Sequence, residues 1–216
     1  MPAWARHHLA LFLDHNPHWS VTIYDEWPPP GTPPELAAIG RHCSQYCQLA
    51  DLIYIWALAT RGGVVMDLDS LTRRPFDGLC EHAAFSTRHA DNDHRLTNGV
   101  MGGHAGGAFG RAWDWILDHD IPNKVPRCHY GPDLMTRLFD DPPDDFTILP
   151  WSYFYPLHCG ERKRADEYAA ANPANREVIL ASLADRWPGL NGGPFAVHLW
   201  GCQGSSHVEI ADQWTA

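Results

Sequence analysis

The chain has 216 residues, of which 44% are hydrophobic and only 19% are charged. This size and composition predict a single globular domain over residues 1–216 and argue against disorder. The formal net charge of −10 argues against a nucleic-acid partner, because a phosphate backbone is bound by Lys and Arg. Aromatic residues make up 12% of the chain, which fits either a sugar-binding surface or a large aromatic core.

The first half of the chain predicts two helices, two strands and a proline-rich loop. In order, these are a helix at 4–13, a strand at 19–24, a loop at 28–34, a buried helix at 44–60 and a strand at 64–66. Gly62 and Gly63 follow the second helix, where a left-handed cap is wanted. The apolar run at 64–66 is typical of a strand covered on both faces, and it leads directly into Asp67-Leu68-Asp69.

The second half continues the mixture of helices and strands. Residues 70–80 are predicted to form a loop. A later helix is indicated by four apolar residues at helical spacing, Phe109, Trp113, Ile116 and Leu117. A strand is expected at 147–149, a helix opened by Asn172-Pro173, and a last strand at 195–200. The whole pattern predicts an α/β fold.

Neither a leader peptide nor a membrane span is visible. The start, Met1-Pro2-Ala3-Trp4, lacks an apolar segment, and no apolar run is long enough to cross a bilayer. We therefore expect a cytoplasmic protein with reduced cysteines. His42, Cys43 and Cys47 are the only tight group of metal-binding residue types, and a zinc site there would need a fourth ligand from elsewhere.

The Asp67-Leu68-Asp69 triplet is the strongest functional signal. Side chains two apart on a strand point the same way, so the two carboxylates should project together. Adjacent carboxylates repel each other unless a cation lies between them. Mg²⁺ and Mn²⁺ take such oxygen ligands and complete their shell with substrate phosphates. The alternative is that two solvated acids simply begin a loop.

Several segments, taken in order, resemble one enzyme family. They are Ala50-Asp51-Leu52-Ile53-Tyr54, Gly62-Gly63 followed by residues 64–69, Asn16-Pro17-His18-Trp19, Arg74-Pro75-Phe76-Asp77, Asn98-Gly99-Val100-Met101, Gly131-Pro132, Phe154-Tyr155-Pro156 and His198-Leu199-Trp200. Together they resemble the DXD-containing glycosyltransferases. That group comprises the family 32 enzymes, which include mannosyltransferases, and the glucosyltransferase region of the large clostridial toxins.

The resemblance implies a GT-A type fold, which is a Rossmann-like mixed sheet flanked by helices. It implies transfer of a sugar from a UDP- or GDP-sugar donor to a glycan, protein or small-molecule acceptor, with retention of configuration and a Mn²⁺ or Mg²⁺ cofactor. By the same resemblance Asp67 and Asp69 are the catalytic, metal-holding acids, and His198 joins them at the metal.

The resemblance also names residues for the donor sugar. It assigns Asp51, Gly63 and Asn98 to the donor side, together with the position of Tyr54. The family has an Arg at that position and a Ser at Ala50, so this chain departs from the pattern there. The first strand of the family fold would lie before Met1, so the expected fold lacks it.

Two other interpretations stay open. An apolar strand ending in Asp67-Leu68-Asp69 also resembles the first motif of haloacid-dehalogenase phosphatases, with Asp67 as nucleophile and Asp69 as acid/base. Leu71 does not fit that motif, 66 residues precede Asp67, and the later Gly-Asp-x-x-x-Asp motif is missing. The third interpretation is a degenerate, non-catalytic module that binds sugars or nucleotides.

Overall fold

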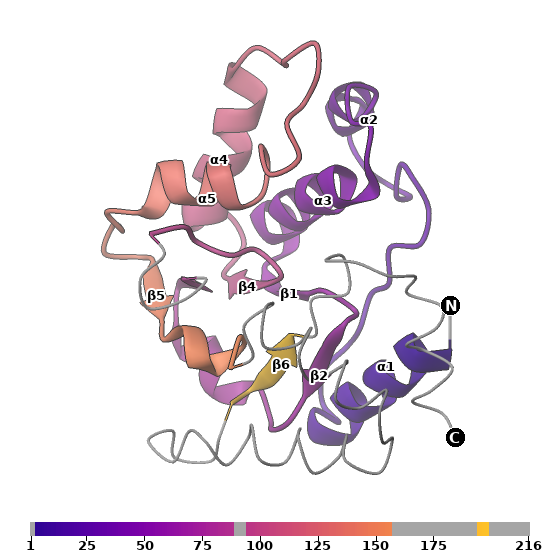
Figure 1. The fold of residues 1–216 in the computed structure, drawn as a ribbon, viewed down its shortest axis with the longest axis vertical. Coiled ribbons are helices and arrows are strands. Elements are labelled where there is room, and N and C mark those ends of the chain that lie inside the picture. Colours follow the sequence, from indigo (N-terminus) through magenta and orange to yellow (C-terminus); the bar gives the residue numbers. More distant parts are fainter. Residues whose placement is uncertain (1–2, 89–93, 157–193, 199–216) are drawn as a thin grey trace, which may run out of the picture. The chain divides into compact units, whose positions relative to one another are not determined.

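The computed structural model of the protein describes residues 3–88, 94–156 and 194–198. A sheet with both parallel and antiparallel pairs is flanked by helices, which confirms the α/β class (Figure 1). The chain forms two compact units: unit 1 comprises 1–19, 66–78 and 150–216, and unit 2 comprises 20–65 and 79–149. The expectation of a single GT-A domain stays a prediction.

The described part of unit 1 contains one long helix and a two-stranded sheet. Its described elements are α1 (Ala3–His15), β2 (Ser70–Thr72), the short 3-10 helix η2 (Trp151–Tyr153) and β6 (Ala196–His198). Helix α1 confirms the predicted helix at 4–13, and it packs against β2 (Figure 1). Strand β6 confirms part of the strand predicted at 195–200, whereas Leu199, Trp200 and the helix predicted from Asn172-Pro173 lie outside the described residues.

Aromatic rings and one buried Asn hold unit 1 together. Phe12, Trp19 and Phe76 meet edge to face, with ring centroids 5.4 to 6.3 Å apart. Asn16 is 2% exposed; its Nδ2 donates to the Phe12 carbonyl at the end of α1, and its Oδ1 accepts from the Phe76 N–H. Trp19 Nε1 donates to Asp77. The segments 16–19 and 74–77, both quoted for the family resemblance, therefore contact each other here. Their contacts form part of the core of unit 1.

Unit 2 carries the main hydrophobic core. Its elements are α2 (Pro34–Gly40), α3 (Tyr46–Arg61), β1 (Gly63–Met66), the 3-10 helix η1 (Asp77–Glu81), β3 (Ala84–Thr87), β4 (Val100–Gly103), α4 (Gly107–Asp118), α5 (Pro132–Phe139) and β5 (Thr147–Leu149); β1 and η1 each extend into unit 1 at one end. Helix α3 packs against α2 and α4 (Figure 1). The predicted helices at 44–60 and around Phe109, and the strands at 64–66 and 147–149, are confirmed as α3, α4, β1 and β5.

The start and end of α3 follow from its sequence. Gln45 and Gln48 form a reciprocal capping box that satisfies backbone N–H groups at the first turn. Gly62 ends the helix with φ +68° and ψ −163°, a conformation that is essentially restricted to glycine. This differs from the expected left-handed cap, because the chain leaves α3 extended and enters β1 at once. A Cβ on Gly62 would also come within 2.6 Å of the Ala105 nitrogen.

The larger sheet has the strand order β1-β4-β3-β5. Strand β3 pairs antiparallel with β4 and parallel with β5, so that Phe85 faces both Gly102 and Thr147. The Phe85 ring and the Gly63 carbonyl fill the space beside Gly102, where a Cβ would approach them to 2.7 and 2.8 Å. This close approach explains a glycine in a buried strand.

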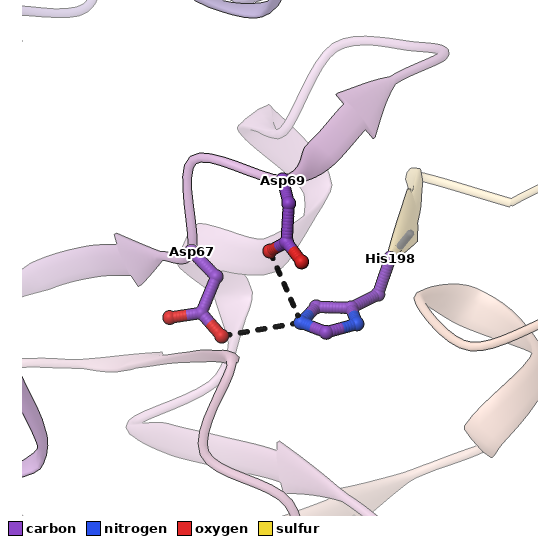
Figure 2. Close-up of side chains that lie close together, drawn as sticks. All are labelled: Asp67, Asp69 and His198. Carbon is purple, nitrogen blue, oxygen red and sulfur yellow. Dashed lines mark hydrogen bonds and ion pairs between the residues drawn. The ribbon is translucent and has the colours of Figure 1, made fainter. Parts of the chain in front are cut away.

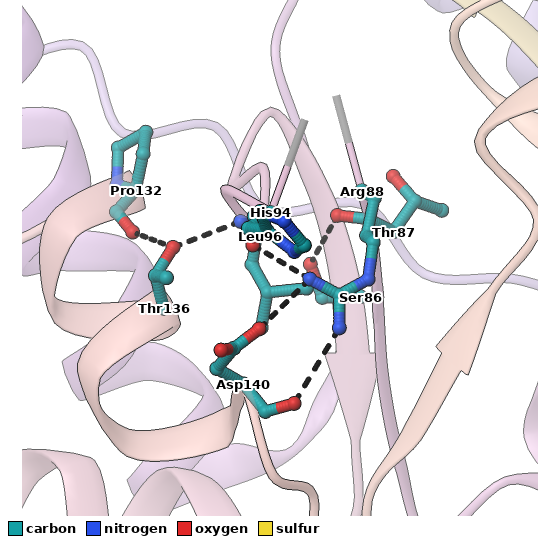
Figure 3. Close-up of polar contacts among 8 residues, drawn as sticks. All are labelled: Ser86, Thr87, Arg88, His94, Leu96, Pro132, Thr136 and Asp140. Atoms are coloured by element: carbon teal, nitrogen blue, oxygen red, sulfur yellow. Dashed lines mark hydrogen bonds and ion pairs between the residues drawn. The ribbon is translucent and has the colours of Figure 1, made fainter. Parts of the chain in front are cut away.

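Polar contacts join the end of β3 to α5 in unit 2. Arg88 donates to the Asp140 carboxylate at 2.9 Å, and the Leu96 N–H donates to the Thr136 hydroxyl at 2.9 Å (Figure 3). That hydroxyl in turn donates to the Pro132 carbonyl in the first turn of α5. These bonds tie the segment after β3 to α5 through side chains of both.

Three local predictions are wrong. Residues 19–24 form no strand, and Val21 and Ile23 are about two-fifths exposed, because no neighbouring strand pairs with this alternating segment. The predicted loop at 70–80 contains β2 and η1. Strand β1 is not covered on both faces: it lies at the edge among the described strands, and its valines are only half-buried.

Within the described part of the chain, no helix combines the length and apolar character needed to cross a membrane.

Candidate metal centre

The acidic triplet lies in a tight turn rather than on a strand. Strand β1 ends at Met66, and the Ser70 N–H donates to the Asp67 carbonyl at 3.0 Å, which closes a four-residue turn before β2 begins. We predicted that the two carboxylates converge because alternate residues of a strand share a face, and this reason is wrong. The carboxylates still converge, because the turn folds Asp69 back toward Asp67.

The third side chain arrives through strand pairing. Strands β2 and β6 pair antiparallel, with Ser70 opposite His198. Because directly opposed residues lie on the same face of a sheet, this register brings His198 beside the turn although 131 positions separate it from Asp67. The backbone N–H of His198 donates to the Phe154 carbonyl, and the His198 and Tyr155 ring centroids lie 5.2 Å apart. These contacts hold both the backbone and the ring of His198 in place.

The three side chains point at one another. His198 Nε2 lies 3.1 Å from Asp67 Oδ2 and 3.4 Å from Asp69 Oδ1 (Figure 2). The His198 side chain is 5% exposed, whereas those of Asp69 and Asp67 are 17% and 36% exposed. The cluster is therefore closed on the histidine side and partly open to solvent on the Asp67 side.

The donor atoms fit a divalent cation. One ligand atom from each residue lies within 4.8 Å of the others, and in the described part of the chain this is the only such group of three. Metal–ligand bonds of about 2.1 Å place neighbouring ligands about 3 Å apart, which is close to both Nε2–carboxylate distances. Asp67, Asp69 and His198 could therefore hold a metal ion on one side and leave coordination positions open on the other.

Buried hydroxyl groups lie next to this centre in sequence and register. Ser70 and Thr72 of β2 are 0% and 2% exposed, and neither hydroxyl has a hydrogen-bond partner within the described structure. Ser70 shares a sheet face with His198. An unpaired buried hydroxyl costs about 1–3 kcal/mol, so a polar group bound near this face would offset part of that cost.

A buried histidine missed by the sequence reasoning contacts the turn. His8, on α1, is 3% exposed and its Nδ1–H donates to the Leu68 carbonyl at 2.7 Å. Burial lowers the pKa of His8, while the bond to Leu68 and the nearby Asp69 charge act in the opposite direction and are smaller. The sequence offered only the His7-His8 pair within an amphipathic helix, which does not distinguish the buried ring from the exposed one.

The predicted donor-side residues Asp51 and Asn98 form a separate pair in unit 2. Asp51 lies on α3 and is 8% exposed, and Asn98 Nδ2 donates to Asp51 Oδ1. A Cβ on Gly131 would clash with Asp51 Oδ2, so the pair fits only beside a glycine. Asp51 is on a helix as expected, but its expected place beside the acidic pair stays a prediction.

The remaining predicted positions lie elsewhere. Tyr54 is half-buried on α3 and packs against the core of unit 2, and Gly63 begins β1 with φ +98°. His42, Cys43 and Cys47 do not gather their ligand atoms into a described metal cluster. Burial, with a smaller contribution from the Asp51 charge, raises the pKa of the Cys43 thiol to about 11. This thiol is therefore protonated at neutral pH.

No protein-family model matches the chain, and the search of curated proteins finds no match either. A functional assignment therefore rests on the geometry of the centre and on the sequence motifs around it.

Proposed function

We propose that the protein is a metal-dependent glycosyltransferase that uses a nucleotide-sugar donor. The observation that carries the proposal is the convergence of Asp67, Asp69 and His198 on one point that is open on one side. Phosphates complete the coordination shell of a hard cation, and a nucleoside diphosphate supplies them. The family resemblance of the segments around the triplet supports the same class.

The residues have distinct tasks in this proposal. The two carboxylates and the imidazole would hold a cation, Mn²⁺ or Mg²⁺. A cation held there would supply positive charge to offset the negative charge that develops on a diphosphate leaving group. Asp67, as the most exposed of the three, lies at the open side where the donor enters.

The family resemblance assigns Asp51 and Asn98, which pair with each other in unit 2, to the donor sugar, and this assignment rests on the resemblance alone. Tyr54 replaces the family's Arg, so the proposal assigns no charged contact to that position. Retention of configuration and the UDP- or GDP-sugar donors are expectations from the resemblance.

The test is donor hydrolysis with purified protein. A panel of UDP- and GDP-sugars is incubated with Mn²⁺, with Mg²⁺ and with EDTA, and nucleoside diphosphate release is measured. We expect release from one or a few donors, dependent on the cation and abolished by EDTA. Asp14→Asn, which removes an exposed carboxylate from α1, serves as the control and should behave as the wild type.

Other outcomes identify the alternatives. Cation binding without turnover of any donor would contradict an enzyme and indicate a sugar- or nucleotide-binding module. Release of inorganic phosphate from phosphomonoesters, with a phosphorylated Asp67, would contradict a glycosyltransferase and indicate a phosphatase of the haloacid-dehalogenase type.

A further inference from the structure

A buried hydrogen bond joins α1 to the turn that carries the metal ligands. The His8 Nδ1–H donates to the Leu68 carbonyl oxygen at 2.7 Å, across 60 positions of sequence. Leu68 itself is 40% exposed, whereas His8 is 3% exposed. The Leu68 side chain at the tip of the turn is therefore exposed to solvent. The Leu68 carbonyl oxygen accepts a hydrogen bond from the buried His8 ring.

The bonded carbonyl belongs to the one peptide that decides the shape of the turn. In the four-residue turn Asp67–Ser70, the central peptide joins the Leu68 carbonyl to the Asp69 nitrogen. The two commonest β-turn types differ by a flip of this central peptide, which changes ψ of the second residue and φ of the third. The third residue here is Asp69, so a flip would change the backbone dihedral that leads into the residue whose carboxylate meets His198.

We propose that His8 is a positioning residue for the metal centre and acts by fixing the central peptide of the turn. This inference rests on the proposed metal site. A hydrogen bond within a buried, low-dielectric setting is stronger than one in water, and a bulk water cannot replace the imidazole at a 3% exposed position. His8 thereby holds Asp67 and Asp69 ready for a cation without contacting it.

The experiment measures Mn²⁺ affinity on the metal-free full-length chain, by electron paramagnetic resonance of free Mn²⁺ with calorimetry as a second method. His8→Leu removes the donor and keeps similar bulk. His8→Asn keeps an N–H donor the same number of bonds from Cβ as Nδ1. His7→Leu alters the exposed neighbour on the same helix and is the matched control. Thermal unfolding in EDTA is recorded for each variant.

We expect His8→Leu to weaken Mn²⁺ binding about 10- to 100-fold, the range typical of outer-sphere partners of metal ligands. His8→Asn should recover most of the affinity, and His7→Leu should match the wild type. A role in packing alone would lower the unfolding temperature in EDTA without this split between Leu and Asn.

Each contrary result has a separate meaning. Wild-type affinity in a folded His8→Leu variant overturns the positioning role and leaves the metal site standing. Equal weakening by Leu and Asn overturns the hydrogen-bond assignment, and the Asn variant alone decides the matter if His8→Leu does not fold. Absence of Mn²⁺ binding by the wild type overturns the metal site and this inference together.

Discussion

Two sites in this molecule place acidic side chains in different surroundings. In unit 2, the buried Asp51 carboxylate accepts from Asn98 and is enclosed beside Gly131. In unit 1, Asp67 and Asp69 face each other across one imidazole and stay partly exposed. The first site pairs one buried carboxylate with an amide, whereas the second brings two partly exposed carboxylates together at one imidazole. Of the two, the second is the better candidate for a cation, because it alone gathers three ligand atoms within 4.8 Å among the described residues.

The largest expected effect is loss of catalysis on Asp69→Asn. Asn keeps the shape of Asp but removes one charge from the metal site. Losing one inner ligand should slow cation-dependent donor hydrolysis on the order of 10²-fold or more. Initial rates for wild type, Asp69→Asn and the exposed-site control Asp14→Asn are compared at saturating Mn²⁺. Equal rates for Asp69→Asn and the wild type would show that the turn does not serve the reaction.

Next in size is the effect of Gly131→Ala on stability. The added Cβ would clash with the Asp51 carboxylate and approach the Asn98 amide to 2.8 Å, and overpacking of this kind costs about 1–3 kcal/mol. Urea denaturation measures the free energy of unfolding. Gly110→Ala is the matched control, because its Cβ meets nothing within 4 Å and it lies inside α4, where Ala should gain about 0.5–1 kcal/mol. A free energy of unfolding for Gly131→Ala that is no lower than that of the wild type would show that the Asp51 site can accommodate the added methyl group.

The same substitution at the two sites should have opposite consequences in EDTA. Asp51→Asn weakens a buried hydrogen bond to a charged group, which is worth about 1.5–3 kcal/mol, so the free energy of unfolding should fall. Asp69→Asn relieves like-charge repulsion in the metal-free protein, so its unfolding free energy should stay within about 0.5 kcal/mol of the wild type or rise. Denaturation curves in EDTA test the contrast, which fails if both variants lose the same stability.

The smallest effect concerns a thiol beside the Asp51 site. Burial raises the pKa of Cys43 to about 11, and the Asp51 charge contributes to that rise. Because a negative neighbour disfavours the thiolate, Asp51→Asn should lower the pKa and raise the thiolate fraction below pH 11. Alkylation of Cys43 at pH 8 should then be about 2- to 5-fold faster, with the exposed Cys80 as an internal reference. An unchanged ratio of the two rates would mean that Asp51 carries no charge in the wild type.

Sequence periodicity predicted the long helices well and the strands only in part. Helix α3 could be recognised because its apolar residues repeat at the helical period and Gly62 ends it. Strands β2, β3 and β4 are only three or four residues long, and two of the four residues of β4 are glycines, so no alternating pattern marks them. The segment 19–24 shows the reverse case, since its alternation is clear but no strand pairs with it.

The candidate site was predictable in its members but not in its geometry. The spacing of Asp67 and Asp69 indicated a cation, and the family resemblance proposed His198. The turn that makes the carboxylates converge depends on one backbone hydrogen bond, and the meeting with His198 depends on the β2–β6 register. His8 could not be predicted, because nothing in the sequence of α1 indicates which of two neighbouring histidines is buried against the turn.

The central claim is that one divalent cation binds at Asp67, Asp69 and His198. Its most direct test is a Mn²⁺ titration of the metal-free protein followed by electron paramagnetic resonance, run in parallel on His198→Ala, Asp67→Ala and the control Asp14→Asn. We predict one bound Mn²⁺ per chain for the wild type and the control, and binding weakened by at least about tenfold in the other two. Equal binding by all four proteins, or none by the wild type, would contradict the claim.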